Sequence, residues 1–213
     1  MTAEPVSIMS KSRFEAFSDG VFAVAVTLLV LDFKAPNLAH ASPAQALGAI
    51  LGMWKPLLSY ATSFIVVGTI WINHHTLFHA VERVDRMSVI VNLILLMLVA
   101  LIPFPTALIG EYSNLQPIVM VYGLVLFANG VVFNVLFGYV RTRYKVVARI
   151  GADPMAVRLS TLRGISYPLG YLIASLLSYV STTISIVFYI ALPIFYLFPS
   201  PVEYQLTRSQ PKS

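Results

Sequence analysis

The residues with the most distinctive chemistry lie at the start of the first long apolar segment, between Arg13 and Asp32. This stretch, RFEAFSDGVFAVAVTLLVLD, opens with a positive charge, a phenyl ring, a hydroxyl and a carboxylate. From Gly20 to Leu31 it contains only Gly, Ala, Val, Leu, Phe and a single Thr. Ionisable groups that lead into an apolar run of helix length cost free energy in a membrane, so they are expected where they serve a function. We therefore predict that this stretch is the first transmembrane helix and lines the path that the protein forms.

The composition indicates a polytopic, all-α membrane protein. The 213 residues are 58% hydrophobic and 11% charged, whereas a soluble domain carries about 25% charged residues. The net charge of +5 would suit nucleic-acid binding, but the basic residues fall between apolar runs, as membrane topology requires. No nucleic-acid partner is therefore expected. The absence of cysteine excludes thiolate metal sites and cysteine nucleophiles.

Six segments are long and apolar enough to cross a bilayer, whose core of about 30 Å needs about 20 residues of helix. We expect helices at about residues 14–33, 44–75, 87–109, 117–140, 162–180 and 183–198, which together make residues 1–213 one transmembrane domain. Lys55-Pro56 predicts a kink in the second helix, which is too long for one straight crossing. The segment Pro103–Pro105 should bend or break the third, and a very short link makes the last two an antiparallel hairpin.

The distribution of lysine and arginine predicts the orientation of these helices. With both termini in the cytoplasm, the cytoplasmic side receives twelve basic residues and the other side only Lys34 and Lys55. The twelve are Lys11, Arg13, Arg83, Arg86, Arg141, Arg143, Lys145, Arg149, Arg158, Arg163, Arg208 and Lys212. The expected location is the cell (inner) membrane, in contact with membrane lipid.

A helical wheel divides the first helix into faces. At 100° per residue, Val24, Leu28 and Leu31 share one side, with Thr27 at its edge. Asp19 points well away from this stripe and is expected to face a neighbouring helix. Small residues on another side allow a second helix to approach closely. The wheel alone does not tell whether the aliphatic stripe meets lipid, another helix or a pore.

The motif Arg13-x-x-x-Phe17-Ser18-Asp19, followed by GVFAVAVTLLVLD, resembles the signature of the lysosomal and endosomal potassium channel family. The resemblance continues in the segment Trp71–His75, with the sequence WINHH, and in the six-span topology. The bacterial branch of this family has six-helix subunits that assemble as tetramers. The resemblance therefore implies a homotetramer in which four copies of the first helix surround a central pore.

In that family, selectivity is attributed to a narrow aliphatic constriction on the first helix, with a hydroxyl nearby. Carried over by position, the constriction residues are Val24, Leu28 and Leu31, and Thr27 supplies the hydroxyl. An aliphatic ring offers an ion no ligands, so potassium must keep part of its hydration or use the oxygen of Thr27. Family members often have Ile or Leu where this chain has Val24, so we expect a wider ring and weaker selectivity.

The polar residues around the motif need partners on the second and third helices. The resemblance suggests Trp71, His75 and Asn92 as partners of Arg13 and Asp19. Such a network can simply lock the helices together. It can also sense protons or ions, because a buried histidine titrates near physiological pH.

Enzymatic and metal-binding functions have little support in the sequence. His75, His79 and Glu82 follow i, i+4, i+7 spacing, which can place three ligands on one helix face, but a solvated helix end explains the spacing better. We therefore expect no bound metal, and no cofactor beyond potassium as the permeant ion. No phosphate-binding loop, nucleophile elbow or dinucleotide fingerprint is present. Apart from Glu15 and Asp32 at the two ends of the first span, Asp19 is the single acid inside a predicted span, so we do not expect an enzyme.

The leading hypothesis is a passive, potassium-preferring channel for monovalent cations. The alternative is a proton-coupled secondary transporter or permease that uses Asp19 and His75. It is less favoured because the sequence shows no internal repeat and few charges at the midplane, which transporters commonly have. A third possibility is a structural membrane protein that does not conduct.

Overall fold

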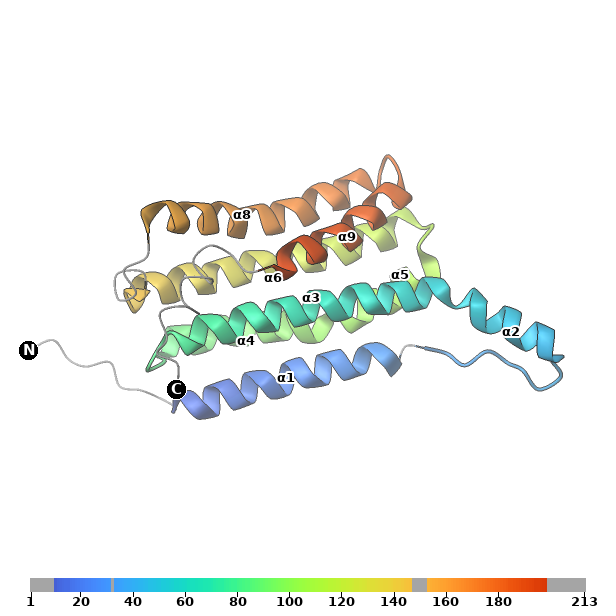
Figure 1. Cartoon of the computed structure of the whole chain (residues 1–213), viewed down its shortest axis with the longest axis horizontal. Coiled ribbons are helices and arrows are strands. Elements are labelled where there is room, and N and C mark those ends of the chain that lie inside the picture. The colour runs from blue at the N-terminus through green and yellow to red at the C-terminus, as the bar shows by residue number, and fades with distance from the viewer. Residues whose placement is uncertain (1–9, 32, 147–152, 199–213) are drawn as a thin grey trace, which may run out of the picture.

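The computed structural model describes residues 10–31, 33–146 and 153–198, and all regular structure in these ranges is helical. The helices run roughly parallel to one another as long rods, and the second one extends beyond the others (Figure 1). Their bounds are α1 (Lys11–Leu31), α2 (Pro43–Gly52), α3 (Trp54–His79), α4 (Arg86–Leu101), α5 (Pro103–Tyr112), α6 (Gln116–Arg143), α8 (Pro154–Leu177) and α9 (Thr182–Leu197). The prediction of an all-α, multi-pass membrane protein is confirmed.

Two of the six rods are bent where the sequence predicts it. A capping box at Ser42 and Gln45 starts α2, and the helix is interrupted at Met53, three residues before Pro56. The third rod breaks at Ile102, directly before the proline-rich turn that opens α5. Because proline removes a backbone donor and crowds the preceding turn, both interruptions follow from the sequence. Thus α2 with α3, and α4 with α5, each form one bent crossing.

The rods differ in length and in hydrophobicity, the two properties that allow a helix to span a membrane. Residues 11–31, 43–79, 86–112 and 116–143 form helices long and apolar enough to span it, and α9 is a shorter apolar helix. Helix α8 has the length but carries Arg158 and Arg163. It begins at Pro154, eight residues before the expected start, because the side chain of Asp153 caps it by accepting from the amide of Ala156, at 3.2 Å. Three of the basic residues assigned to the cytoplasmic side lie outside the described residues: Arg149, Arg208 and Lys212.

The helices pack in an order that leaves α1 at one edge of the bundle and α8 at the opposite edge (Figure 1). Helix α1 contacts α3, α4 and α5, whereas α8 packs on α6 and α9. The α6–α8–α9 contact is close because Gly123 leaves room for the hydroxyls of Ser175 and Tyr189, which would collide with a Cβ at that position. Small residues allow such close approach between membrane helices.

Candidate functional site

Helix α1 has one side buried in the bundle and one side exposed. The buried positions recur with helical spacing and contact α3 and α4: Phe14, Ser18, Phe22, Ala25 and Leu29. The opposite side carries the predicted stripe, with Val24, Leu28 and Leu31 exposed over 56%, 40% and 73% of their surface. Within the described part of the chain, therefore, the aliphatic stripe is not covered by any other helix.

Thr27 lies on the exposed side beside this stripe. Its hydroxyl donates a hydrogen bond to the carbonyl oxygen of Val24, at 2.9 Å. A hydroxyl has one hydrogen to donate and two lone pairs to accept. Since the hydrogen is used within the helix, the oxygen of Thr27 is left as an acceptor that can face a cation.

A buried chain of three polar side chains holds α1 to α3 and α4. The side-chain amide of Asn92 on α4 donates to the hydroxyl oxygen of Ser18, at 3.0 Å. The Oδ1 atom of Asn92 lies 2.8 Å from Nε2 of His74 on α3. Because the amide nitrogen already donates to Ser18, the histidine is assigned as the donor to the amide oxygen. All three side chains are almost fully buried, so these bonds fix the depth and rotation of α1 against its neighbours.

His74, rather than the predicted His75, belongs to this buried chain. The rings of Phe14, Phe22 and Phe78 surround His74, with centroids 6.2, 5.5 and 4.8 Å from its own. His75 is exposed and stacks on Trp71, at a centroid distance of 5.8 Å. The physical reason is the 100° turn between successive helical residues, which points His74 towards α1 and His75 outwards.

The remaining motif residues lie on the exposed side. The indole nitrogen of Trp71 donates to a carboxylate oxygen of Asp19, at 2.8 Å, and so makes a second link between α1 and α3. Phe17 is half exposed. Arg13 is exposed, and among the described residues it has no side-chain partner. The structure thus brings Asp19 to Trp71 and Ser18 to Asn92, but it does not join Arg13 to either pair.

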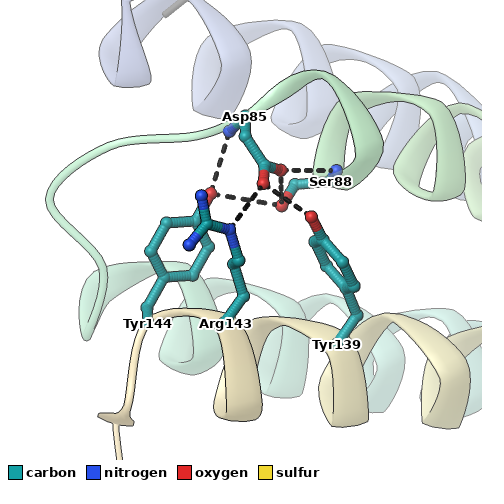
Figure 2. Close-up of polar contacts among 5 residues, drawn as sticks. All are labelled: Asp85, Ser88, Tyr139, Arg143 and Tyr144. Atoms are coloured by element: carbon teal, nitrogen blue, oxygen red, sulfur yellow. Dashed lines mark hydrogen bonds and ion pairs between the residues drawn. The ribbon is translucent and has the colours of Figure 1, made fainter. Parts of the chain in front are cut away.

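A further polar cluster, which was not predicted from the sequence, ties the start of α4 to the end of α6 (Figure 2). We call it the Asp85 cluster: Asp85, Ser88, Tyr139, Arg143 and Tyr144. One carboxylate oxygen of Asp85 accepts from the amide and hydroxyl of Ser88, at 2.9 and 2.8 Å, and so caps α4. The other accepts from the hydroxyl of Tyr139 at 2.6 Å and from Nε of Arg143 at 3.4 Å.

The backbone of the loop takes part as well, because the amide of Asp85 donates to the hydroxyl oxygen of Tyr144, at 2.8 Å. The sequence signal for part of this cluster was present: an aspartate three residues before a serine at a helix start is a capping pattern. The contacts to α6 join residues more than fifty positions apart and leave no local pattern.

The electrostatics of Asp85 make the cluster sensitive to acid. Partial burial opposes ionisation of the carboxyl, but the hydrogen bonds from Tyr139, Ser88 and Arg143 outweigh it and hold the pKa of Asp85 below its usual range. The charged form is therefore the one that the fold stabilises.

Replacement of Asp85 by Asn should weaken the fold and change its response to acid. The lowered pKa means that the carboxylate contributes its full stabilisation above the ordinary aspartate pKa of about 3.9, and that this contribution is lost as the pH falls through the lower pKa of the folded state. Since hydrogen bonds to charged groups contribute about 1.5–3 kcal/mol, Asp85→Asn should lower the melting temperature at neutral pH and flatten its decline in acid. Thermal unfolding from about pH 3 to pH 7 measures both effects.

Glu15→Gln is the control for this measurement. It also removes one carboxylate, but from a partly exposed ion pair between neighbouring turns of α1, with Lys11 at 3.5 Å, and such pairs contribute little. Equal acid profiles for Asp85→Asn and the wild type would show that the cluster does not stabilise the fold.

A metal centre finds no support in the described ranges, where no group of three histidine, aspartate or glutamate side chains is placed to hold an ion. The exposed histidines of α3, His75 and His79, stack on each other with ring centroids 6.0 Å apart. The site therefore consists of helix α1, whose exposed face is aliphatic and carries the hydroxyl oxygen of Thr27. The buried hydrogen bonds of Asn92 hold this helix in position.

Known proteins share this sequence and fold. The family model of the endosomal/lysosomal potassium channel TMEM175 matches residues 13–103. A potassium channel of Streptomyces collinus is 37% identical over 191 residues, which cover 87% of this chain and 91% of the relative. The mouse endosomal/lysosomal proton channel TMEM175 is 39% identical over 111 residues, 47% of this chain but 22% of that longer protein.

A solved structure agrees with these sequence relatives. The crystal structure of a lysosomal potassium-selective channel TMEM175 homolog from Chamaesiphon minutus has a TM-score of 0.74 and 35% identity, and the match covers 87% of this chain and 95% of that one. The sequence and fold likenesses each cover 87% of the chain, well beyond the motif on α1. The chain belongs to the family of the endosomal/lysosomal potassium channel TMEM175.

Proposed function

We propose that this protein is a passive, potassium-preferring cation channel whose pore is lined by α1. The observation that carries the proposal is the division of α1 into a buried side and an uncovered aliphatic side. Charged and polar residues at the start of a membrane helix cost free energy, and a helix that contacted only lipid would have no use for them. The names of the similar proteins, potassium channels among them, support the same function.

A single copy of α1 cannot enclose a path for ions, so the pore requires several copies of the chain. The family resemblance makes four the expected number, and closed symmetric rings are the usual form of such assemblies. In this arrangement the exposed sides of four α1 helices meet around one axis. The assembly lies in the inner membrane, uses no cofactor and catalyses no reaction.

The constriction of this pore consists of Val24, Leu28 and Leu31. Side chains of this kind provide no ligands, so an ion passes while it keeps part of its water shell. Potassium loses water at a lower cost than sodium, which gives it a modest advantage. The free oxygen of Thr27 replaces part of the lost hydration, and a dry aliphatic ring can also close the pore by dewetting.

The anchors of α1 set the width of the constriction. The bonds from Asn92 to Ser18 and to His74 fix how α1 is rotated and how deep it lies. The bond from Trp71 to Asp19 holds the cytoplasmic end of the same helix. These residues position the pore without touching the ion in the constriction.

Ion flux into proteoliposomes that contain the purified protein tests the proposal. Under a potassium gradient and then a sodium gradient, we expect passive uptake that is faster for potassium and needs no proton movement. Asp19→Asn should still conduct. Uptake that requires a counter-moving proton, and that Asp19→Asn abolishes, would instead identify a proton-coupled transporter.

A further inference from the structure

The bundle contains a hollow between α3, α6 and α8, on the side away from α1. Helix α9 has 16 residues whereas α6 has 28, so at 1.5 Å per residue α9 is shorter by about 18 Å. It therefore covers α3 and α6 along only part of their length. The hollow lies towards the basic end of the bundle and is partly open to the outside.

The walls of this hollow are more apolar than its residue types suggest. The hydroxyls of Thr69 and Thr76 donate to carbonyls of their own helix, both at 2.8 Å. The side-chain amide of Asn134 donates to the carbonyls of Gly130 and Gly164, also at 2.8 Å. The backbone carbonyls already satisfy these donors, so few polar hydrogens are left to face the hollow. Its wall is therefore mainly hydrocarbon and includes the side chains of Leu77 and Phe133.

The charges around the hollow have one sign. Arg141 and Arg163 line it, and among its described lining residues there is no aspartate or glutamate. The guanidinium of Arg141 donates to the hydroxyl of Thr161, at 2.8 Å, and Arg163 donates to the carbonyl of Phe195, at 3.1 Å. The hydroxyl of Thr161 is neutral, so its bond orients the guanidinium of Arg141 without cancelling the charge. The chemistry that complements this charge is an anion.

The length of the hollow matches one leaflet of a bilayer. Along α3 it reaches from Thr69 to Ala80, which is about 16 Å of helix. Half of a hydrocarbon core of about 30 Å is about 15 Å. Arg141, near the end of α6, lies at the basic end, which the positive-inside rule assigns to the cytoplasm. An apolar slot of leaflet length with an arginine at its outer end has the shape and charge of a lipid site.

We propose that this hollow binds an anionic phospholipid of the cytoplasmic leaflet, with one acyl chain between α3, α6 and α8. The phosphate of the headgroup pairs with Arg141, and the chain runs along the apolar wall towards the middle of the membrane. Basic pockets between membrane helices are a recognised means of holding such headgroups. The site is separate from the face of α1 that carries the proposed pore, and it does not depend on ion conduction.

Native mass spectrometry of the purified protein, titrated with phosphatidylglycerol or phosphatidylcholine of the same acyl chains, tests this site. The wild type should bind phosphatidylglycerol more tightly. Loss of one positive charge near an anionic headgroup should weaken that binding about fivefold, so we expect this change in Arg141→Gln and unchanged binding of phosphatidylcholine. Arg141→Lys keeps the charge and should retain most of the preference.

Arg158→Gln is the matched control, because Arg158 lies on the same helix as Arg163 but does not line the hollow. Thr76→Phe fills the slot with both arginines intact and should also weaken phosphatidylglycerol binding. Equal affinity of the wild type for the two lipids, or equal losses in Arg141→Gln and Arg158→Gln, would refute the site. Displacement of phosphatidylglycerol by equimolar oleate would refute the phosphate headgroup and indicate a free fatty acid.

Discussion

Leu28→Ala should reduce the preference for potassium over sodium in proteoliposomes, whereas Leu29→Ala should lower stability and leave the preference unchanged. The two residues are neighbours on α1, but Leu28 is 40% exposed and Leu29 only 1%. Removal of the Leu28 side chain widens the proposed constriction and lets both ions pass with more of their water. A fall of about 1.4 kcal/mol in the barrier would raise flux about tenfold, with sodium gaining more than potassium.

Leu29 is the control because its truncation has the same chemistry on the opposite side of the helix. A buried Leu→Ala substitution costs about 2–5 kcal/mol, so the melting temperature of Leu29→Ala should fall clearly while that of Leu28→Ala changes little. Flux under separate potassium and sodium gradients, together with thermal unfolding, measures both. If Leu28→Ala conducts with the wild-type rate and preference, α1 does not form the constriction.

The sequence predicted most of the fold because the decisive signals are local. Apolar runs of bilayer length identify the crossings, and the prolines at positions 56 and 103 mark where two of them bend. The early start of α8 also had a local signal, since the Asp153-Pro154 pair is a typical helix beginning. The predicted helix ends were less accurate where a capping pattern extends a helix into a polar region, as it does at the start of α8.

The candidate site could be predicted only in part, since some of it depends on which helices meet. The wheel placed Val24, Leu28 and Leu31 together, and these three side chains are indeed uncovered. It could not choose between His74 and His75, because α3 is apolar around most of its circumference and its sequence does not reveal which side meets α1. The Asp85 cluster was missed for a related reason: the residues that pair with Asp85 on α6 become neighbours only once α4 and α6 have packed.

Asn92→Leu should be among the most damaging single substitutions in the chain, although leucine is a common residue in membrane helices. Asn92 is 1% exposed and is the only residue of the described chain that bonds to both Ser18 and His74. Leucine would leave Nε2 of His74 buried without its partner, and the Ser18 hydroxyl would keep only the bond that it donates to the carbonyl of Phe14, at 3.0 Å. A buried polar group that loses its partner costs about 1–3 kcal/mol. The melting temperature should therefore fall, and the potassium preference should weaken as α1 loses its fixed rotation.

A double-mutant cycle separates the loss of this bond from a general packing defect. Ser18→Ala removes the partner on α1, so the loss in Ser18→Ala with Asn92→Leu should be smaller than the sum of the two single losses. Hydrogen bonds between membrane helices give coupling energies of about 0.6 kcal/mol on average and up to about 1.7 kcal/mol, and a buried bond of 3.0 Å should lie towards the upper end. Strictly additive losses would mean that the bond from Asn92 to Ser18 does not stabilise the fold, and α1 would then be held by its apolar contacts and by the Trp71–Asp19 bond.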